Sequence, residues 1–177
     1  MTYRCPERYS GKRFYRGDPL YSRMAVYQRQ TIVDAPFERV WDFHSGIDGL
    51  TSVTPDWMGL NVEAVVGYPG DLEAGTRIEL SLTPFGLIPA GSWTALITDR
   101  EIGMDSAWFR DKMLDGPFHR WEHTHRFTAV NGRTRLQDRV EYELPVVHRL
   151  QLSGIAYPFF ELIFRSRHRR TKQLLEH

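Results

Sequence analysis

Two histidines and an aspartate in the second half of the chain have the types and spacing to do chemistry together: His123, His125 and Asp138. Between them stands Asn131-Gly132, a dipeptide suited to a type I′ turn, in which both central residues take positive φ. A two-residue hairpin loop at this point places His125 directly opposite Asp138. The same face then carries three further cross-strand pairs: Phe127 with Leu136, His123 with Val140, and Trp121 with Tyr142.

The hairpin face that carries these residues is mostly apolar, whereas the other face is charged and polar. The apolar face is therefore expected to look inward, where an unpaired charge is costly. Because opposed residues on antiparallel strands have Cβ atoms about 5 Å apart, Asp138 can accept a hydrogen bond from the His125 ring and raise its pKa. Asp111, on the neighbouring strand, could join them if it shares the inward face with Phe109 and Met113.

Four interpretations of this polar group are open. It could be a satisfied network that fixes the strands, or a set of groups that orient a ligand. It could also be an acid–base pair, in which His125 carries the proton and Asp138 orients the ring. A metal site is the fourth, because His-x-His on a strand presents two ligands to one face. The sequence assures no third ligand, so we predict no metal and no cofactor. His123 and His125 are predicted first as ligand-binding residues, and His125 and Asp138 are the catalytic candidates.

Large apolar side chains are predicted to form the wall of a ligand cavity around this group. On the sheet these are Trp93, Phe109, Trp121, Phe127 and Tyr142, and on the last helix Phe159, Phe160 and Ile163. About half of them are expected to be plain core, because large apolar residues at strand or helix spacing are more often packing than ligand contacts.

The elements that position the cavity follow from apolar periodicity. Residues 23–33 are predicted as a strand, and a helix is expected to follow, with Asp34 capping it and Pro36 in its first turn. Phe37, Val40, Trp41 and His44 give that helix one apolar face. A second short helix or turn is expected over 46–55, followed by strands over 59–68, 76–83, 91–100 and 106–114 and then the hairpin.

A long helix is predicted over residues 153–174, with Pro158 either kinking it or lying in its first turn. Its apolar stripe consists of Ala156, Phe159, Phe160, Ile163 and Phe164. The basic end of this helix, residues 165–172, is expected to be solvated and to complement the helix dipole. The alternatives are a site for an acidic partner or a phosphate, or that Arg167 and Arg170 reach back to carboxylates on the sheet.

Three stretches carry a resemblance to a known superfamily: residues 30–44, residues 109–127 and residues 164–168. With the order of elements above, the chain resembles the SRPBCC or START-like superfamily, and in particular its polyketide cyclase-like, ligand-binding branch. The resemblance implies an α+β helix-grip fold, with a curved antiparallel sheet of about seven strands around a long C-terminal helix and two short helices after the first strand. The two-histidine iron site of the superfamily's oxygenases is not recognisable here, and no catalytic residues are carried over.

Composition narrows the classes of partner. The 23 Lys and Arg nearly cancel the 22 Asp and Glu, so the field that drives non-specific nucleic-acid binding is missing. Cys5 is the only cysteine, which is typical of a reducing compartment, and we predict a cytoplasmic protein. No apolar run has the roughly 18 residues of a membrane span.

Residues 1–22 are predicted as a tail outside the core, with a nucleic-acid- or partner-binding arm as the alternative. Residues 23–174 are expected to form the ligand-binding domain, and residues 175–177 could be the remnant of an affinity tag.

Three functions remain in competition at this point. The leading prediction is binding of a small hydrophobic molecule that is lipid-, polyketide- or quinone-like by resemblance. The second is a polyketide cyclase or dehydratase that uses the His125–Asp138 pair. The third is a regulatory module that works through its outer surface. No oligomeric state is predicted.

Overall fold

The structure is a computed structural model that describes residues 24–68, 70–87, 89–143 and 156–176. Its elements, in chain order, are β1 (Ala25–Val33), α1 (Phe37–His44), α2 (Ile47–Val53), the 3₁₀ turn η2 (Asp56–Met58), β2 (Leu60–Val66), β3 (Arg77–Leu82), the 3₁₀ turn η3 (Pro84–Gly86), β4 (Gly91–Ile102), β5 (Ser106–Leu114), β6 (Arg120–Val130), β7 (Arg133–Glu143) and α3 (Ala156–Leu175). The predicted tail, residues 1–22, and His177 lie outside the described residues.

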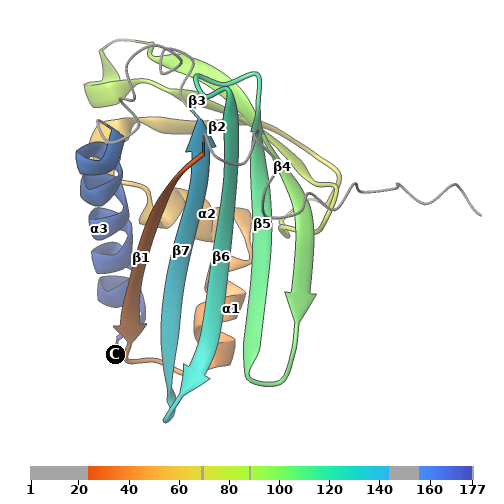
Figure 1. Cartoon of the computed structure of the whole chain (residues 1–177), viewed down its shortest axis with the longest axis vertical. Coiled ribbons are helices and arrows are strands. Elements are labelled where there is room, and N and C mark those ends of the chain that lie inside the picture. The colour runs from red at the N-terminus through yellow and green to blue at the C-terminus, as the bar shows by residue number, and fades with distance from the viewer. Residues whose placement is uncertain (1–23, 69, 88, 144–155, 177) are drawn as a thin grey trace, which may run out of the picture.

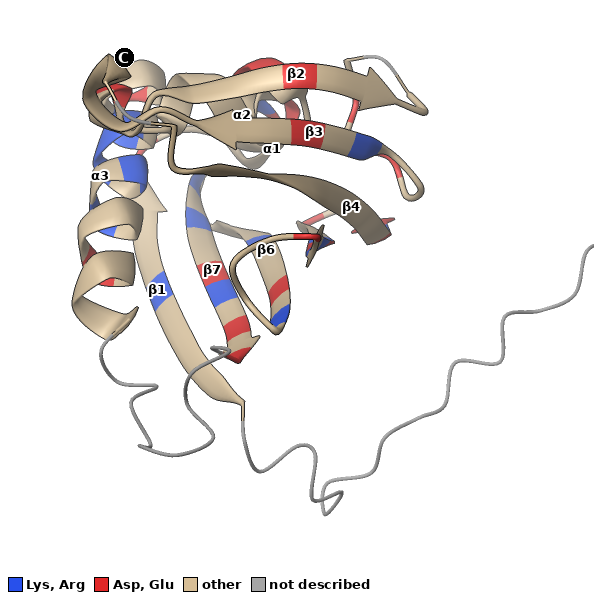
Figure 2. Cartoon of the chain, turned by 90° about the horizontal axis from the view of Figure 1, so that it is seen from above, with Lys and Arg blue, Asp and Glu red and all other residues tan. Residues whose placement is uncertain are grey.

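The strands form one antiparallel sheet of seven strands in the order β1-β7-β6-β5-β4-β3-β2. The sheet curls, so that β2, β3 and β4 face β1, β7 and β6 across the molecule, and α3 runs along the open side beside β1 (Figures 1 and 2). Register shifts between Val62 and Ala64 and between Ile97 and Asp99 are bulges, which increase local twist and help the sheet to bend. This is the predicted α+β helix-grip fold.

The β6–β7 hairpin has the register that its turn predicts. Asn131 and Gly132 both take positive φ, 51° and 75°. His125 is paired with Asp138, and along both strands buried residues alternate with more exposed ones. One residue of slippage would turn the buried set outward, so the turn decides which side chains reach the interior.

The entry to α1 differs from the prediction in one detail. No side chain caps this helix, because its N-cap is Pro36 and Asp34 lies two residues too early. The backbone N–H of Asp34 instead donates to the Glu176 carboxylate at 2.9 Å, which ties the end of β1 to the end of α3. The apolar face of α1 is buried as predicted.

The helix α3 closes one side of the curled sheet. Pro158 lies in its first turn, where a missing backbone N–H has no consequence for the helix ladder. Tyr27 of β1 stacks on Phe164 at 5.2 Å between ring centroids and donates a hydrogen bond to Glu161 at 2.9 Å. At the other end of the helix, Leu175 is buried in the main core, so the fold uses this residue of the segment that was set aside as a tag remnant.

Candidate functional site

A cavity of about 330 Å³ lies between the concave face of the sheet and α3. Most of its wall is apolar, and its strand side comes mainly from β3, β4 and β5. Residues from those three strands are Ile78, Leu80, Leu82, Trp93, Ala95, Ile97, Phe109 and Met113. Polar side chains are concentrated in a smaller group, which includes Asp111, His123, His125 and Arg167.

The Asp138 carboxylate is the centre of this polar group. His123 Nε2 lies 2.8 Å from its Oδ1, and His125 Nδ1 lies 2.9 Å from the same oxygen. The other oxygen is 2.6 Å from His168 Nε2 of α3. All four side chains are buried. One carboxylate therefore joins β6, β7 and α3 through three imidazole rings.

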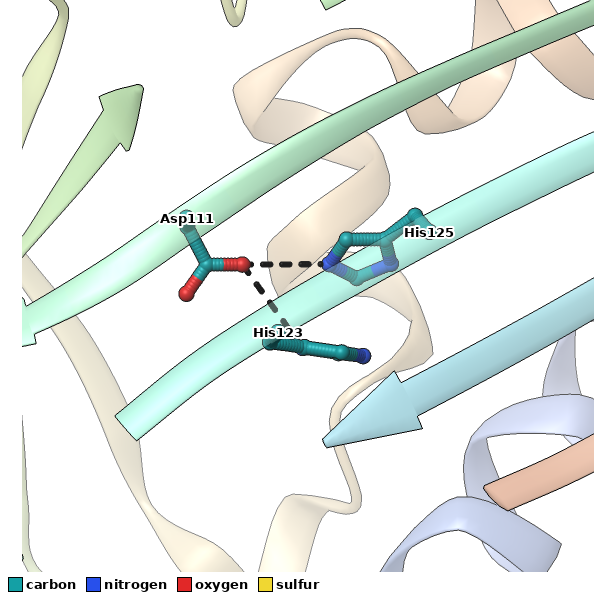
Figure 3. Close-up of side chains that lie close together, drawn as sticks. All are labelled: Asp111, His123 and His125. Carbon is teal, nitrogen blue, oxygen red and sulfur yellow. Dashed lines mark hydrogen bonds and ion pairs between the residues drawn. The ribbon is translucent and has the colours of Figure 1, made fainter. Parts of the chain in front are cut away.

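Asp111 of β5 lies beside the same two histidines of β6 and contacts the nitrogen of the His125 ring that Asp138 does not (Figure 3). Its Oδ2 is 3.3 Å from His125 Nε2 and 3.6 Å from His123 Nδ1. The two imidazole rings lie against each other with centroids 3.7 Å apart, and Phe109 stacks on His125 at 4.2 Å. Asp111 therefore shares the inward face, as the sequence analysis required for it to join the group.

The shifts in pKa show which charges this arrangement supports. Burial by itself disfavours the ionised carboxylates, but their contacts with the histidines outweigh it and hold the pKa of Asp111 below its usual value and that of Asp138 well below. Burial and the neighbouring His125 lower the pKa of His123. Burial also opposes the charged form of His125, yet hydrogen bonds with Asp111 and Asp138 raise its pKa overall. Both carboxylates are thus ionised at neutral pH.

Two further polar groups sit at the same end of the cavity. Arg167 of α3 donates to Thr54 Oγ1 at 3.1 Å. His44 of α1 shares a hydrogen bond of 3.2 Å with Thr171. Burial lowers the pKa of His44 to about 3, so this ring is neutral. Arg167 places a positive charge near Asp111 and Asp138.

Nine of the predicted ligand-binding residues line the cavity. They are Trp93, Phe109, Asp111, Trp121, His123, His125, Phe159, Phe160 and Ile163. Phe159 lines it from the rim, since 49% of its surface is exposed.

The other three predicted residues, Phe127, Asp138 and Tyr142, do not line the cavity. Phe127 is covered by Trp41 of α1, at 5.5 Å between ring centroids, and Tyr142 by Phe160 of α3, at 4.7 Å. Asp138 is shielded by the histidines that bind it. The sequence predicts which face of a strand looks inward, but the packed helices decide where that face stays open.

Three parts of the site were not predicted from the sequence: His168, His44 and Arg167. For His168 a signal was present, because Phe160, Phe164 and His168 follow one another at i, i+4 and i+8 on a single helix face. The surrounding arginines favoured a solvated helix end instead. For Arg167, the structure bears out only part of the alternative that it reaches back to carboxylates on the sheet: its charge acts on Asp111 and Asp138, but its hydrogen bond goes to Thr54 at the end of α2.

Residues 33–167 match a family model described as polyketide cyclase / dehydrase and lipid transport. The chain belongs to this family. Its match spans every element from the end of β1 to the middle of α3, including each residue of the polar group except His168. The SRPBCC resemblance seen in the sequence is thereby confirmed. No match was found among curated proteins.

Solved structures share the family's fold at low sequence identity. Truncated norcoclaurine synthase from Thalictrum flavum matches with a TM-score of 0.62 and 15% identity, over 87% of this chain and 95% of that one. A protein from Nitrosospira multiformis gives a TM-score of 0.59 and 15% identity, over 85% and 96% of the two chains. A Mycobacterium smegmatis protein gives 0.56 and 20%, over 84% and 89%. These likenesses show the fold alone.

Among the described residues, no helix is both long and apolar enough to cross a membrane.

Proposed function

We propose that this protein binds a small hydrophobic molecule, of lipid-, polyketide- or quinone-like chemistry, in the cavity between the sheet and α3. The observation that carries the proposal is a cavity of about 330 Å³ whose wall is apolar except at one end. Binding sites for small molecules commonly have this composition, with a few placed polar groups that fix the ligand's orientation. Norcoclaurine synthase, which shares the fold, has a solved structure of a point mutant in complex with a transition state analogue.

Without a bound metal ion, the polar end of the cavity favours a ligand with a neutral polar group over one with an anionic head. Asp111 and Asp138 are ionised, and among the described residues that line the cavity Arg167 offsets them with a fixed charge. A second negative charge from the ligand would be placed close to two carboxylates. A carbonyl group can accept a hydrogen bond from Arg167, and a hydroxyl group can also donate one to Asp111, without that cost.

The first test is binding of the neutral fluorescent probe N-phenyl-1-naphthylamine, alongside native mass spectrometry of freshly purified protein. Ala95→Trp adds a large ring where the wall is now a methyl group. We expect wild type to bind one probe per chain and the variant to bind at least tenfold more weakly. Val26→Trp, a change at an exposed position of β1, is the matched control and should bind as wild type does. Equal binding by all three proteins would place the probe outside the cavity and contradict the proposal.

The enzymatic alternative uses the same residues but also requires that a substrate reach the ring of His125. His125 is held by Asp138 on one side, and its other nitrogen lies 3.3 Å from Asp111. A poly-carbonyl substrate would have to take the place of Asp111 beside that nitrogen. Cyclase or dehydratase activity stays a prediction, and turnover by His125→Gln and Asp138→Asn at the wild-type rate would exclude it.

A further inference from the structure

Asp111, His123 and His125 bring three electron-pair donors together at the edge of the cavity (Figure 3). Each residue offers one ligand atom, and these atoms lie within 4.8 Å of one another. On the side of the rings that faces Asp111 Oδ2, the nitrogens are His123 Nδ1 and His125 Nε2. His123 and His125 are buried, and Asp111 is largely so. Imidazole nitrogens together with a carboxylate oxygen are the usual protein ligands of zinc and related ions.

The hydrogen bonds to Asp138 decide which ring nitrogens carry a proton. An ionised carboxylate can only accept, so His123 donates through Nε2 at 2.8 Å and His125 through Nδ1 at 2.9 Å. When each ring is neutral, the nitrogen with the free electron pair is the one that faces Asp111; without a metal, His125 Nε2 can instead carry a proton that it donates to Asp111 at 3.3 Å. A metal ion that takes the place of this proton would meet two lone pairs and a carboxylate oxygen, with Asp111 Oδ2 3.3 and 3.6 Å from the two nitrogens.

Asp138 has the place that an outer carboxylate takes in many metal sites. A histidine that ligates a metal almost always donates its other N–H to a carboxylate or carbonyl, which fixes the tautomer and the ring orientation. Here one carboxylate does this for both histidines, and His168 holds its second oxygen at 2.6 Å. Asp138 and His168 thus hold the two histidine rings in place on the side opposite Asp111. Asp111, His123 and His125 themselves line the cavity.

The separations also fit a particular coordination. A zinc ion about 2.0–2.2 Å from each of three ligands in a tetrahedron holds them roughly 3.4 Å apart. Two of the three separations, those from Asp111 Oδ2 at 3.3 and 3.6 Å, lie on either side of that value, and the third is within 4.8 Å. Because all three residues line the cavity, the fourth position would open toward whatever occupies it.

We propose that Asp111, His123 and His125 form a binding site for a divalent transition metal of the zinc type, with Asp138 as its outer carboxylate and one coordination position open to the cavity. The sequence analysis predicted no metal because no third ligand was assured. The structure supplies it from β5, since Asp111 is the register partner of His123. The open position would take an oxygen or nitrogen atom of a cavity ligand or water.

The test uses the full chain without an added polyhistidine tag, stripped with EDTA and dialysed. Co²⁺ is the probe, because its visible d–d bands report coordination directly, and Zn²⁺ is then added as competitor. We expect one Co²⁺ per chain, loss of the bands with one equivalent of Zn²⁺, and a rise in Tm with either metal. Asp111→Asn and His125→Gln should weaken binding more than a hundredfold, and Asp138→Asn about 10–100-fold.

His119→Gln is the matched control, because this histidine is exposed and outside the cluster. It should bind Co²⁺ as wild type does. Asp111→Asn keeps the shape of the side chain, so it carries the comparison if a histidine variant fails to fold. If Asp111→Asn also fails to fold, the proposal is tested by the Co²⁺ spectrum and the Tm of wild type alone. Absence of d–d bands and of a Tm shift at millimolar metal would overturn the proposal, as would wild-type affinity in the Asp111 and His125 variants.

Discussion

Asp138 shows how one buried charge can be accommodated in a largely apolar interior. Its two oxygens accept from three imidazoles at 2.6–2.9 Å. Hydrogen bonds to charged groups contribute roughly 1.5–3 kcal/mol each, enough together to offset the several kcal/mol that burial of a carboxylate costs. The contacts come from two strands and a helix, so the same bonds that satisfy the charge also align those elements.

The neutral histidine of α1 should make the protein less stable as the pH falls. Burial lowers the pKa of His44 to about 3, whereas an unfolded histidine titrates near 6.5. The unfolded state therefore binds more protons below pH 6.5, and stability is lost from that pH down toward 3. Between pH 7 and 5 this residue alone should cost about 2 kcal/mol. His44→Gln should show a loss smaller by that amount, measured as the free energy of unfolding in urea at both pH values.

The comparison between wild type and variant is needed because other groups near His44 act on it as well. Asp138, Arg167, His125 and His168 all act on it. The raised pKa of His125 works in the opposite direction, since its contribution is present at low pH and is lost as the pH rises through the folded value. Taking the difference between the two proteins removes these shared contributions. Identical pH dependence in both would show that His44 is not held neutral.

At the residue scale, the sequence could predict contacts within the hairpin but not contacts brought by a distant helix. The pairing of His125 with Asp138 followed from turn and register, both of which are local. The bond between His168 and Asp138 spans 30 residues and depends on how α3 is rotated. That rotation is set by packing of Phe160 and Phe164 against the sheet, which no local pattern fixes.

The β6–β7 hairpin is the element on which the site depends most directly. Its turn requires positive φ at Asn131 and Gly132, and its register presents His123, His125 and Asp138 to the interior. The charged face of the same hairpin stays outside. Because side chains alternate along a strand, a correct turn is enough to place all three residues.

Gly132→Ala tests the contribution of this turn. Gly132 has φ 75°, and a Cβ at this position would meet no atom within 4 Å, so the cost comes from backbone conformation alone. We expect a loss of about 1 kcal/mol in the free energy of unfolding, measured in urea. Gly132→Asn is the control and should lose less, since Asn tolerates the left-handed region. An Ala variant as stable as wild type would show that the turn does not constrain the register.

At the scale of elements, the order of strands and helices was predictable because each has a clear period and clear ends. Which helix covers each part of the sheet could not be predicted. Phe127 and Tyr142 alternate inward as predicted, but α1 and α3 rest on them. Coverage depends on long-range packing between helices and sheet, whereas alternation depends only on neighbouring residues.

The whole molecule divides its interior between packed core and open cavity. One cluster fills the side under α1, with Trp41, Phe127 and Leu136, and another lies under α3, with Tyr27, Tyr142 and Phe160. The cavity takes the remaining space over β3 to β6. A fold that leaves about 330 Å³ unfilled forgoes dispersion contacts that a packed core would gain, which is expected where binding a ligand is the function.

Two alanines on neighbouring strands distinguish open space from packed core. Ala95 of β4 lines the cavity, whereas Ala107 of β5 is fully buried in the main core and does not line it. Ala95→Leu should leave the free energy of unfolding unchanged or raise it by up to about 1 kcal/mol, because the added carbons enter empty space. Ala107→Leu adds the same atoms where none fit, and should cost about 1–3 kcal/mol. Urea unfolding of both variants measures the contrast. Equal destabilisation would mean that the side chains around Ala95 close over the cavity in solution, and that the space seen between sheet and helix is not open to a ligand.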